Sequence, residues 1–267
     1  MKLERLIIFI LLSLITVLPA VSNAWDVPPL DMPERGTMNA YDKDGEYRWT
    51  ADWTTESITE NGKKKLRLTL TGSGLISPFT EKRTWKSVSL WNADESFYPL
   101  SSETVIKDMS GKTVMIDKKT VDTSLGTVLF RRKDLTGDTS QTEIFDLTDN
   151  TIIMEGMVLA LRDLPFRKGS SAKAKFITNE PAEYNIEFKQ MGIETVSTPG
   201  GDIRCYKVEF IPKLGLLSVF KAFFPKTYMW FTVDEPHRWV KYEGLENGRD
   251  SPEVVMKVVD FKDASDN

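Results

Sequence analysis

The amino-acid sequence predicts an all-β protein: a single large antiparallel curved sheet or open barrel, with one or two short helices packed on it or capping it. Apolar side chains recur at every second position through many short segments, and turn residues separate these segments at regular spacing. Helical spacing covers only two segments. A parallel sheet needs a long crossover between strands, so the scarcity of helices favours antiparallel pairing.

The alternation is clearest near the start of the expected sheet. Residues 47–53 place the indoles of Trp49 and Trp53 on one face of a strand, and residues 66–70 alternate leucines with polar side chains. Asn61-Gly62 lies between these segments, and Asn-Gly flanked by alternating segments is a strong hairpin signal. One apolar face opposite a polar face is typical of a sheet that is wetted on one side.

The same pattern continues to the end of the chain. Ser110-Gly111 and the polar stretch around Gly137 predict two further hairpin turns, and Thr198-Pro199-Gly200-Gly201 predicts another. We expect an irregular N-terminal arm over residues 25–44 and one antiparallel β domain over 45–267. The other strands are expected at 85–91, 104–109, 112–121, 127–132, 142–147, 184–188, 203–210, 227–233, 239–242 and 254–261.

Residues 149–164 break the two-residue period and follow helical spacing. One face of the expected helix carries Ile153, Met157, Leu161 and Leu164. Pro165 disfavours helical geometry at the residue before it, so the helix should end at Leu164. We expect this helix to lie across the sheet and fill its concave side.

Residues 213–224 also follow helical spacing, between two prolines. The segment inserts Phe220, Phe223 and Phe224 between two strands that a short turn could have joined. One interpretation is a plug over one end of the sheet. The other is a lid over an apolar pocket or a finger that touches lipid.

The first 24 residues have the pattern of a cleavable signal peptide. Lys2 and Arg5 precede an apolar stretch at 6–18, and small residues at Ser22 and Ala24 form a cleavage site. The apolar stretch is shorter than the roughly 20 residues that span a bilayer. We therefore expect a periplasmic protein without stable transmembrane insertion after cleavage; secretion or an uncleaved inner-membrane anchor are the alternatives.

Charge and residue usage narrow the function classes. The formal net charge is −4 with mixed signs, which disfavours nucleic acid as a partner. Cys205 is the single cysteine, so an internal disulfide is excluded, and its strand-like neighbours indicate a small buried side chain. His237 is the single histidine and follows a proline in a predicted turn, which argues against a catalytic triad and against a metal site with several histidines.

The sequence carries no catalytic signature, so we expect no enzyme activity, no cofactor and no metal. Gly72-Ser73-Gly74 lacks the following helix and Lys-Ser/Thr of a phosphate loop. Carboxylate pairs such as Asp234 and Glu235 remain open as a glycosidase arrangement. The stretch 42–46 is a weak candidate for a surface calcium site, because it lacks the distal Glu of a calcium loop.

The aromatic residues are the main candidates for a ligand site. Many tryptophans fall in predicted strands, where they either fill a core or line an apolar cleft. With the phenylalanines of 213–224, the candidate lining residues are Trp49, Trp53, Trp85, Trp91, Phe220, Phe223, Phe224 and Trp230.

Four stretches occur in an order typical of one family. They are Leu-Ala-Leu-Arg-Asp-Leu-Pro-Phe at 159–166, Met-Gly-Ile-Glu-Thr-Val at 191–196, a Thr-Pro-Gly-Gly turn leading into Cys-Tyr-Lys-Val-Glu at 198–209, and Trp-Phe-Thr-Val-Asp at 230–234. Over residues 145–262 the chain resembles the exported bacterial domain of unknown function 3108. That group is similar to periplasmic lipoprotein-carrier half-barrels. The resemblance implies an envelope location and a hydrophobic concave face, and it implies no reaction.

Two functions follow from these observations. The first is a non-enzymatic binder or carrier of an apolar ligand, such as a lipid or lipidated molecule, in the cell envelope. The alternative is a structural or protein-interaction module with a filled core and an envelope protein as its partner. A cavity on the concave face would favour the first function.

Overall fold

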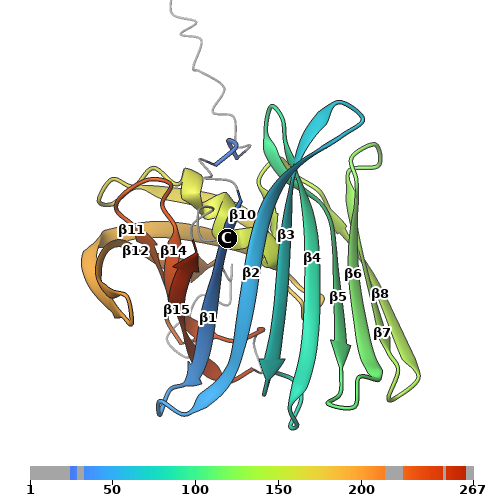
Figure 1. Cartoon of the computed structure of the whole chain (residues 1–267). Helices are drawn as coiled ribbons and strands as arrows, with labels where there is room; N and C mark the ends of the chain where they lie inside the picture. Colours follow the sequence, from blue (N-terminus) through green and yellow to red (C-terminus); the bar gives the residue numbers. More distant parts are fainter. Residues whose placement is uncertain (1–24, 29–32, 214–224, 249–250, 263–267) are drawn as a thin grey trace, which may run out of the picture.

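A computed structural model describes residues 25–28, 33–213, 225–248 and 251–262. Its strands form one sheet of fifteen members that does not close, so the predicted fold class is confirmed (Figure 1). The expected signal peptide at 1–24 lies outside the described residues, as does all of the phenylalanine-rich segment after Lys213. None of the helices in the described ranges is long and apolar enough to cross a bilayer.

The sheet consists of two meanders that meet at its centre. The first runs outward from the centre and comprises β1 (Glu34–Asp42), β2 (Tyr47–Glu60), β3 (Lys63–Gly74), β4 (Arg83–Ala93), β5 (Phe97–Lys107), β6 (Thr113–Asp122), β7 (Thr127–Asp134) and β8 (Thr139–Asp146). The second returns and comprises β9 (Thr151–Ile153), β10 (Ser171–Ile177), β11 (Glu183–Thr198), β12 (Gly201–Pro212), β13 (Thr227–Thr232), β14 (Trp239–Leu245) and β15 (Glu253–Lys262). β15 then pairs with β1.

The two edges of this sheet, β8 and β9, are joined directly by residues 147–150. Because each residue extends a chain by at most about 3.6 Å, the edges lie within roughly 18 Å of each other at this link. A sheet with so many strands must therefore bend round on itself, which gives it a concave inner face. Figure 1 shows β1–β8 as a curved wall, with the short helical turns (yellow) on its inner side.

The expected helix at 149–164 is shorter than the periodicity predicted. Residues Thr151–Ile153 form β9, which pairs in parallel with β10, and the helical turns follow only from Met154. These turns are η1 (Met154–Gly156), α2 (Met157–Ala160) and η2 (Leu161–Asp163). Three successive β-branched residues, Thr151 to Ile153, favour the strand over the helix. The helical segment ends before Pro165, as predicted.

The irregular arm expected at 25–44 is also corrected. Glu34–Asp42 forms β1, the central strand, which pairs with β2 on one side and β15 on the other. The many small and polar residues of this stretch concealed it, because pairing on both sides rather than side-chain pattern stabilises the strand. Trp25, before it, is buried, forms a β-bridge to Phe97 and packs its ring edge-on against Phe188.

The predicted hairpin turns are confirmed. Asn61 and Gly62 both have positive φ, 53° and 76°, which is the geometry of a two-residue type I′ turn between β2 and β3. Ser110-Gly111 joins β5 to β6, Gly137 lies between β7 and β8, and Pro199-Gly200 lies between β11 and β12.

Two buried apolar clusters cover the concave face. The larger contains Trp53, Leu66, Leu68, Trp91 and much of the helical segment. The smaller contains Ala40, Trp49, Ala51, Trp85, Ile106, Val114 and Met115. Three half-buried side chains, Met38, Leu70 and Met256, pack against both clusters, so the clusters adjoin along the centre of the sheet.

Two glycines allow indole rings to lie flat in this interior. Gly36 pairs with Trp53 across β1 and β2, and Gly72 pairs with Trp85 across β3 and β4. A Cβ at either glycine would stand 2.2 Å from an indole carbon of its partner. The indole rings of Trp53 and Trp85 therefore pack directly against the backbone at these glycines, and the space on the other side of the rings stays open.

Candidate functional site

A cavity of about 350 Å³ opens on the concave face between the two apolar clusters. This volume lies at the lower end of the roughly 300–1,000 Å³ typical of small-molecule pockets. Its wall combines side chains from β1 to β5 with the helical segment and with β10 to β15. The site thus depends on both meanders of the sheet.

Most of the wall is apolar and adaptable. Four tryptophans line it, Trp49, Trp53, Trp85 and Trp239. Five methionines also line it: Met38, Met154, Met157, Met229 and Met256. Methionine is unbranched and polarizable, so a methionine-rich wall fits irregular apolar molecules without a fixed shape.

The structure separates the tryptophans named from the sequence. Trp49, Trp53 and Trp85 line the cavity. Trp91 does not: its ring stacks on Phe97 at 4.7 Å between centroids, and its edge rests on Gly156. Trp230 lies on the opposite face of β13, in a separate cluster with Val196, Cys205 and Val240. Both placements correct the expectation, and Phe220, Phe223 and Phe224 lie outside the described residues.

Trp230 is on the outer face because side chains alternate along β13. Met229 and Phe231, its neighbours, join the inner cluster, so Trp230 must point the other way. Its Nε1 donates to Glu194 Oε2 at 3.0 Å. The ammonium groups of Lys207 and Lys241 lie 5.1 Å and 4.5 Å from its ring centroid, which accounts for the residue without a ligand.

A buried carboxylate fixes the orientation of Trp49. Glu246 Oε1 accepts a hydrogen bond from Trp49 Nε1 at 2.5 Å, and Glu246 Oε2 accepts one from the Ser77 backbone N–H at 2.8 Å. Arg48 pairs with the same carboxylate through Nε and Nη2. Because all of these partners hold one carboxylate, the Trp49 indole cannot swing away from the cavity wall.

A second buried ion pair attaches the helical segment to the centre of the sheet. Arg162 on η2 donates to both oxygens of Glu34 on β1, at 2.7 Å and 2.8 Å, and both side chains are 2% exposed. This two-point contact fixes direction as well as distance. It explains the arginine of the stretch Leu-Arg-Asp-Leu-Pro at 161–165, to which the sequence alone assigned no role.

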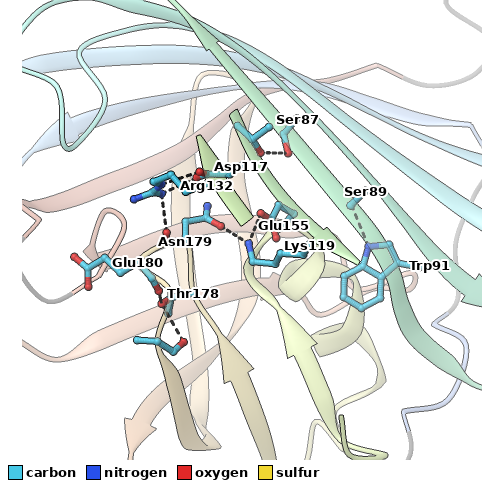
Figure 2. A network of polar contacts seen from close by, with 12 residues as sticks. Ser87, Ser89, Trp91, Asp117, Lys119, Arg132, Glu155, Thr178, Asn179 and Glu180 are labelled. Carbon is cyan, nitrogen blue, oxygen red and sulfur yellow. Dashed lines mark hydrogen bonds and ion pairs between the residues drawn. The ribbon is translucent and has the colours of Figure 1, made fainter. Parts of the chain in front are cut away.

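The inner face also carries two polar rows, one across four strands and one across three. Ser87, Thr104, Asp117 and Arg132 face each other in register across β4 to β7. Ser89, Ser102 and Lys119 form the adjacent row on β4 to β6. Figure 2 shows Ser87, Ser89, Asp117, Lys119 and Arg132 of these rows with the polar contacts that they make.

The polar rows connect the two ends of the open sheet. Lys119 Nζ donates to Glu155 Oε1 on η1 at 2.6 Å and to Asn179 Oδ1 beyond β10 at 2.5 Å (Figure 2). Arg132 pairs with both oxygens of Asp117 and donates to the Asn179 carbonyl at 2.8 Å. The hydrogen bonds that Arg132 donates to Asp117 raise the pKa of the Arg132 guanidinium, so this group stays charged.

One oxygen of this network is left over. Glu155 Oε2 is buried and has no hydrogen-bond partner, although Glu155 lines the cavity and its side chain is only 7% exposed. Ser87, Ser89, Thr104, Thr178 and Asn179 line the same cavity. The wall is therefore largely apolar, with this polar region in addition to the buried Glu34–Arg162 pair and Glu246.

The remaining reactive groups lie away from the cavity wall. Cys205 is buried on the outer face, as predicted, and burial raises the pKa of its thiol to about 12. His237 sits in the β13–β14 turn with its ring 4.6 Å from the Phe166 ring, and its Nδ1 lies 3.0 Å from the Thr232 carbonyl oxygen. Within the described ranges, no group of three or more His, Cys, Asp or Glu side chains is placed to hold a metal.

Sequence reasoning missed the charged residues of the site. The side chains of Glu34, Lys119, Glu155 and Glu246 are buried, although charged residues are mostly exposed and the sequence analysis assigned none of them to the site. Their partners are 36 to 198 residues away along the chain, so local pattern carries no signal for them. Only the fold brings them together.

The fold and the cavity define a class: a strongly bent, open antiparallel sheet with a largely apolar pocket on its concave side. Residues 36–246 match the family described as "Protein of unknown function (DUF3108)". The chain belongs to this family. The match extends well before residue 145, so the first meander is part of the family domain as well.

Two solved structures are similar to this chain. One is a Bacteroides fragilis protein, assigned as an exported protein with a YmcC-like fold, at 11% identity and a TM-score of 0.38. The other is a Parabacteroides distasonis protein, assigned as a lipoprotein, at 9% identity and a TM-score of 0.30. Both alignments cover 90% of this chain and 99% of the other. No curated protein matches the sequence.

Proposed function

We propose that this protein is a periplasmic, non-enzymatic binder or carrier of an apolar molecule, such as a lipid or a lipidated molecule. The observation that supports it is the cavity of about 350 Å³ lined by four tryptophans and five methionines. Apolar surface moved from water into such a wall contributes about 25 cal/mol per Å². Even one acyl chain therefore gains useful affinity there.

The half-buried residues at the centre of the sheet support the same proposal. Met38, Leu70 and Met256 lie between two buried clusters yet remain partly accessible. Large apolar side chains in this position would be fully covered in a filled core. A molecule in the cavity that they face would cover them.

The alternative is a structural or interaction module with an envelope protein as its partner. Large exposed apolar side chains in the described ranges stand at hairpin ends and along β8 and β11, for example Met109, Leu125 and Ile144. Single exposed residues of this kind are ordinary on protein surfaces. The cavity therefore favours the binding function over this one.

The test is binding of an uncharged, environment-sensitive fluorophore and its displacement by a long-chain alcohol. Leu70→Trp would fill the cavity, and Ile144→Trp adds the same side chain on exposed β8 as a matched control. We expect the parent and the control to bind and the filled variant to bind at least tenfold more weakly, with thermal melting to verify folding. Equal binding by the filled variant would reject the cavity as the site.

A further inference from the structure

The polar region of the cavity indicates which part of a ligand it would hold. We define the polar region as Ser87, Ser89, Thr104, Glu155, Thr178 and Asn179, all of which line the cavity. Ser87 and Thr104 are cross-strand partners joined by a hydrogen bond of 2.9 Å, and Glu155 and Asn179 share Lys119 (Figure 2). The region therefore contains two hydrogen-bonded groups of side chains within a largely apolar wall.

The patch offers a strong acceptor. Glu155 Oε1 is taken by Lys119, whereas Glu155 Oε2 is buried without a partner. A buried carboxylate oxygen without a donor is unfavourable, and a donor that reaches it forms a charge-assisted hydrogen bond. A ligand that carries an O–H or N–H group at this point would satisfy that oxygen.

The charges around the cavity are already balanced. Arg162 is the basic side chain among the described lining residues, and it is paired with Glu34 on both nitrogens of its fork. Lys119 is paired with Glu155, and Arg132 with Asp117. A carboxylate or phosphate head would bring an unpaired negative charge towards Glu155, and a buried unpaired charge is strongly disfavoured.

We infer that the polar region binds the uncharged, hydrogen-bond-donating head of the apolar ligand, specifically an acylglycerol hydroxyl, through Glu155 Oε2 and the Ser87–Thr104 pair. The inference rests on the proposed function, because it assigns the head group of the molecule whose chain occupies the apolar wall. Acylglycerol combines both features in one molecule: an acyl chain for the methionine-rich wall and free hydroxyls for the patch.

The experiment compares three probes that share one acyl chain: a monoacylglycerol, the free fatty acid and the fatty acid methyl ester. The methyl ester has no donor, and the free acid is anionic at neutral pH. Calorimetry on the full exported chain measures each affinity. We expect the monoacylglycerol to bind at least tenfold more tightly than either of the other two.

Variants separate head-group recognition from the structural role of the network. Ser87→Ala removes a hydroxyl from the patch and leaves the Lys119–Glu155 pair intact. Ser102→Ala is its matched control, because Ser102 is buried next to the patch on β5 but is not among the residues that line the cavity. We expect S87A to weaken monoacylglycerol binding about fivefold without changing methyl ester binding, and S102A to change neither.

Glu155→Gln tests the acceptor itself. It replaces one carboxylate oxygen by an amide nitrogen, so the preference for the monoacylglycerol over the methyl ester should fall about tenfold while the methyl ester binds as before.

If E155Q fails to fold, S87A still tests the head-group assignment. If no probe binds to the parent, the proposed function falls and the inference falls with it. If all three probes bind equally, or S87A behaves like S102A, the head-group assignment is wrong while the proposed function stands.

Discussion

Replacing Gly72 by alanine should disturb the cavity wall more than a substitution at any solvent-exposed position would. The added Cβ would stand 2.2, 2.4 and 2.8 Å from three carbon atoms of the Trp85 indole. Carbon atoms pack at about 3.5–4.0 Å, so the rigid ring must retreat by roughly 1.3 Å or more. Trp49 packs edge-on against Trp85 at 5.6 Å and is itself held by Glu246, so the ring moves into the cavity.

The expected magnitude follows from overpacking. Forcing an additional methyl group into a packed interior costs about 1–3 kcal/mol. In a protein of this size each kcal/mol lowers the melting temperature by roughly 2–4 °C, which gives a decrease of about 2–12 °C for G72A. Differential scanning calorimetry measures the decrease directly, and ligand affinity should fall with it because the ring takes up cavity volume.

Two controls make this test specific to the Gly72–Trp85 contact. Gly200→Ala adds the same methyl group in the β11–β12 turn, where the nearest atom, Thr198 Oγ1, would be 3.8 Å away, and it should change stability by less than about 0.5 kcal/mol. Trp85→Leu removes the clashing ring, so G72A should add little further loss in that background. A G72A protein that melts within about 1 °C of the parent would refute the reasoning.

Three further outcomes test the fold around the site. Arg162→Met leaves the Glu34 carboxylate buried without a partner and should lower the free energy of unfolding by about 3–5 kcal/mol, measured by denaturant titration. Adding Glu34→Met should recover most of the loss. An equal loss in the single and double variants would argue against the pair. The raised pKa of Cys205, about 12, keeps its thiol protonated at pH 8, so iodoacetamide should label it only after unfolding. Rapid labelling of the folded chain, seen by mass spectrometry, would contradict this. Gly62→Ala at a φ of 76° should destabilise the β2–β3 hairpin by about 1 kcal/mol, measured by chemical denaturation, and a neutral effect would contradict the type I′ turn.

Local signals in the sequence were enough to predict the sheet and most of its hairpins. Asn61-Gly62 and Ser110-Gly111 fix turn geometry through their own backbone preferences, so they need no knowledge of the rest of the chain. The alternation through residues 47–53 likewise identified the inner face of β2. These features explain why the fold class and the cavity residues Trp49 and Trp53 could be named in advance.

The site as a whole depends on register, which the sequence does not state. On β4 the inner face carries Ser87 and Ser89 beside Trp85, and the outer face carries Val88 and Leu90, so hydrophobicity alone does not identify the two serines as buried. The burial of the two serines is favourable only because Thr104 and Trp91 supply hydrogen-bond partners. Trp91 was misplaced because pattern alone does not distinguish cavity wall from packed core, and Trp230 because the register of β13 directs it to the outer face.

The most direct measurement is mass spectrometry of the organic extract of protein expressed in bacteria with its own first 24 residues and purified without detergent. A cavity with a largely apolar wall and a buried, unpaired carboxylate oxygen should retain a neutral lipid with a free hydroxyl, present in the parent extract and depleted in the Leu70→Trp extract. Extracts from both proteins that contain no lipid, together with a parent that binds no added lipid, would contradict the account.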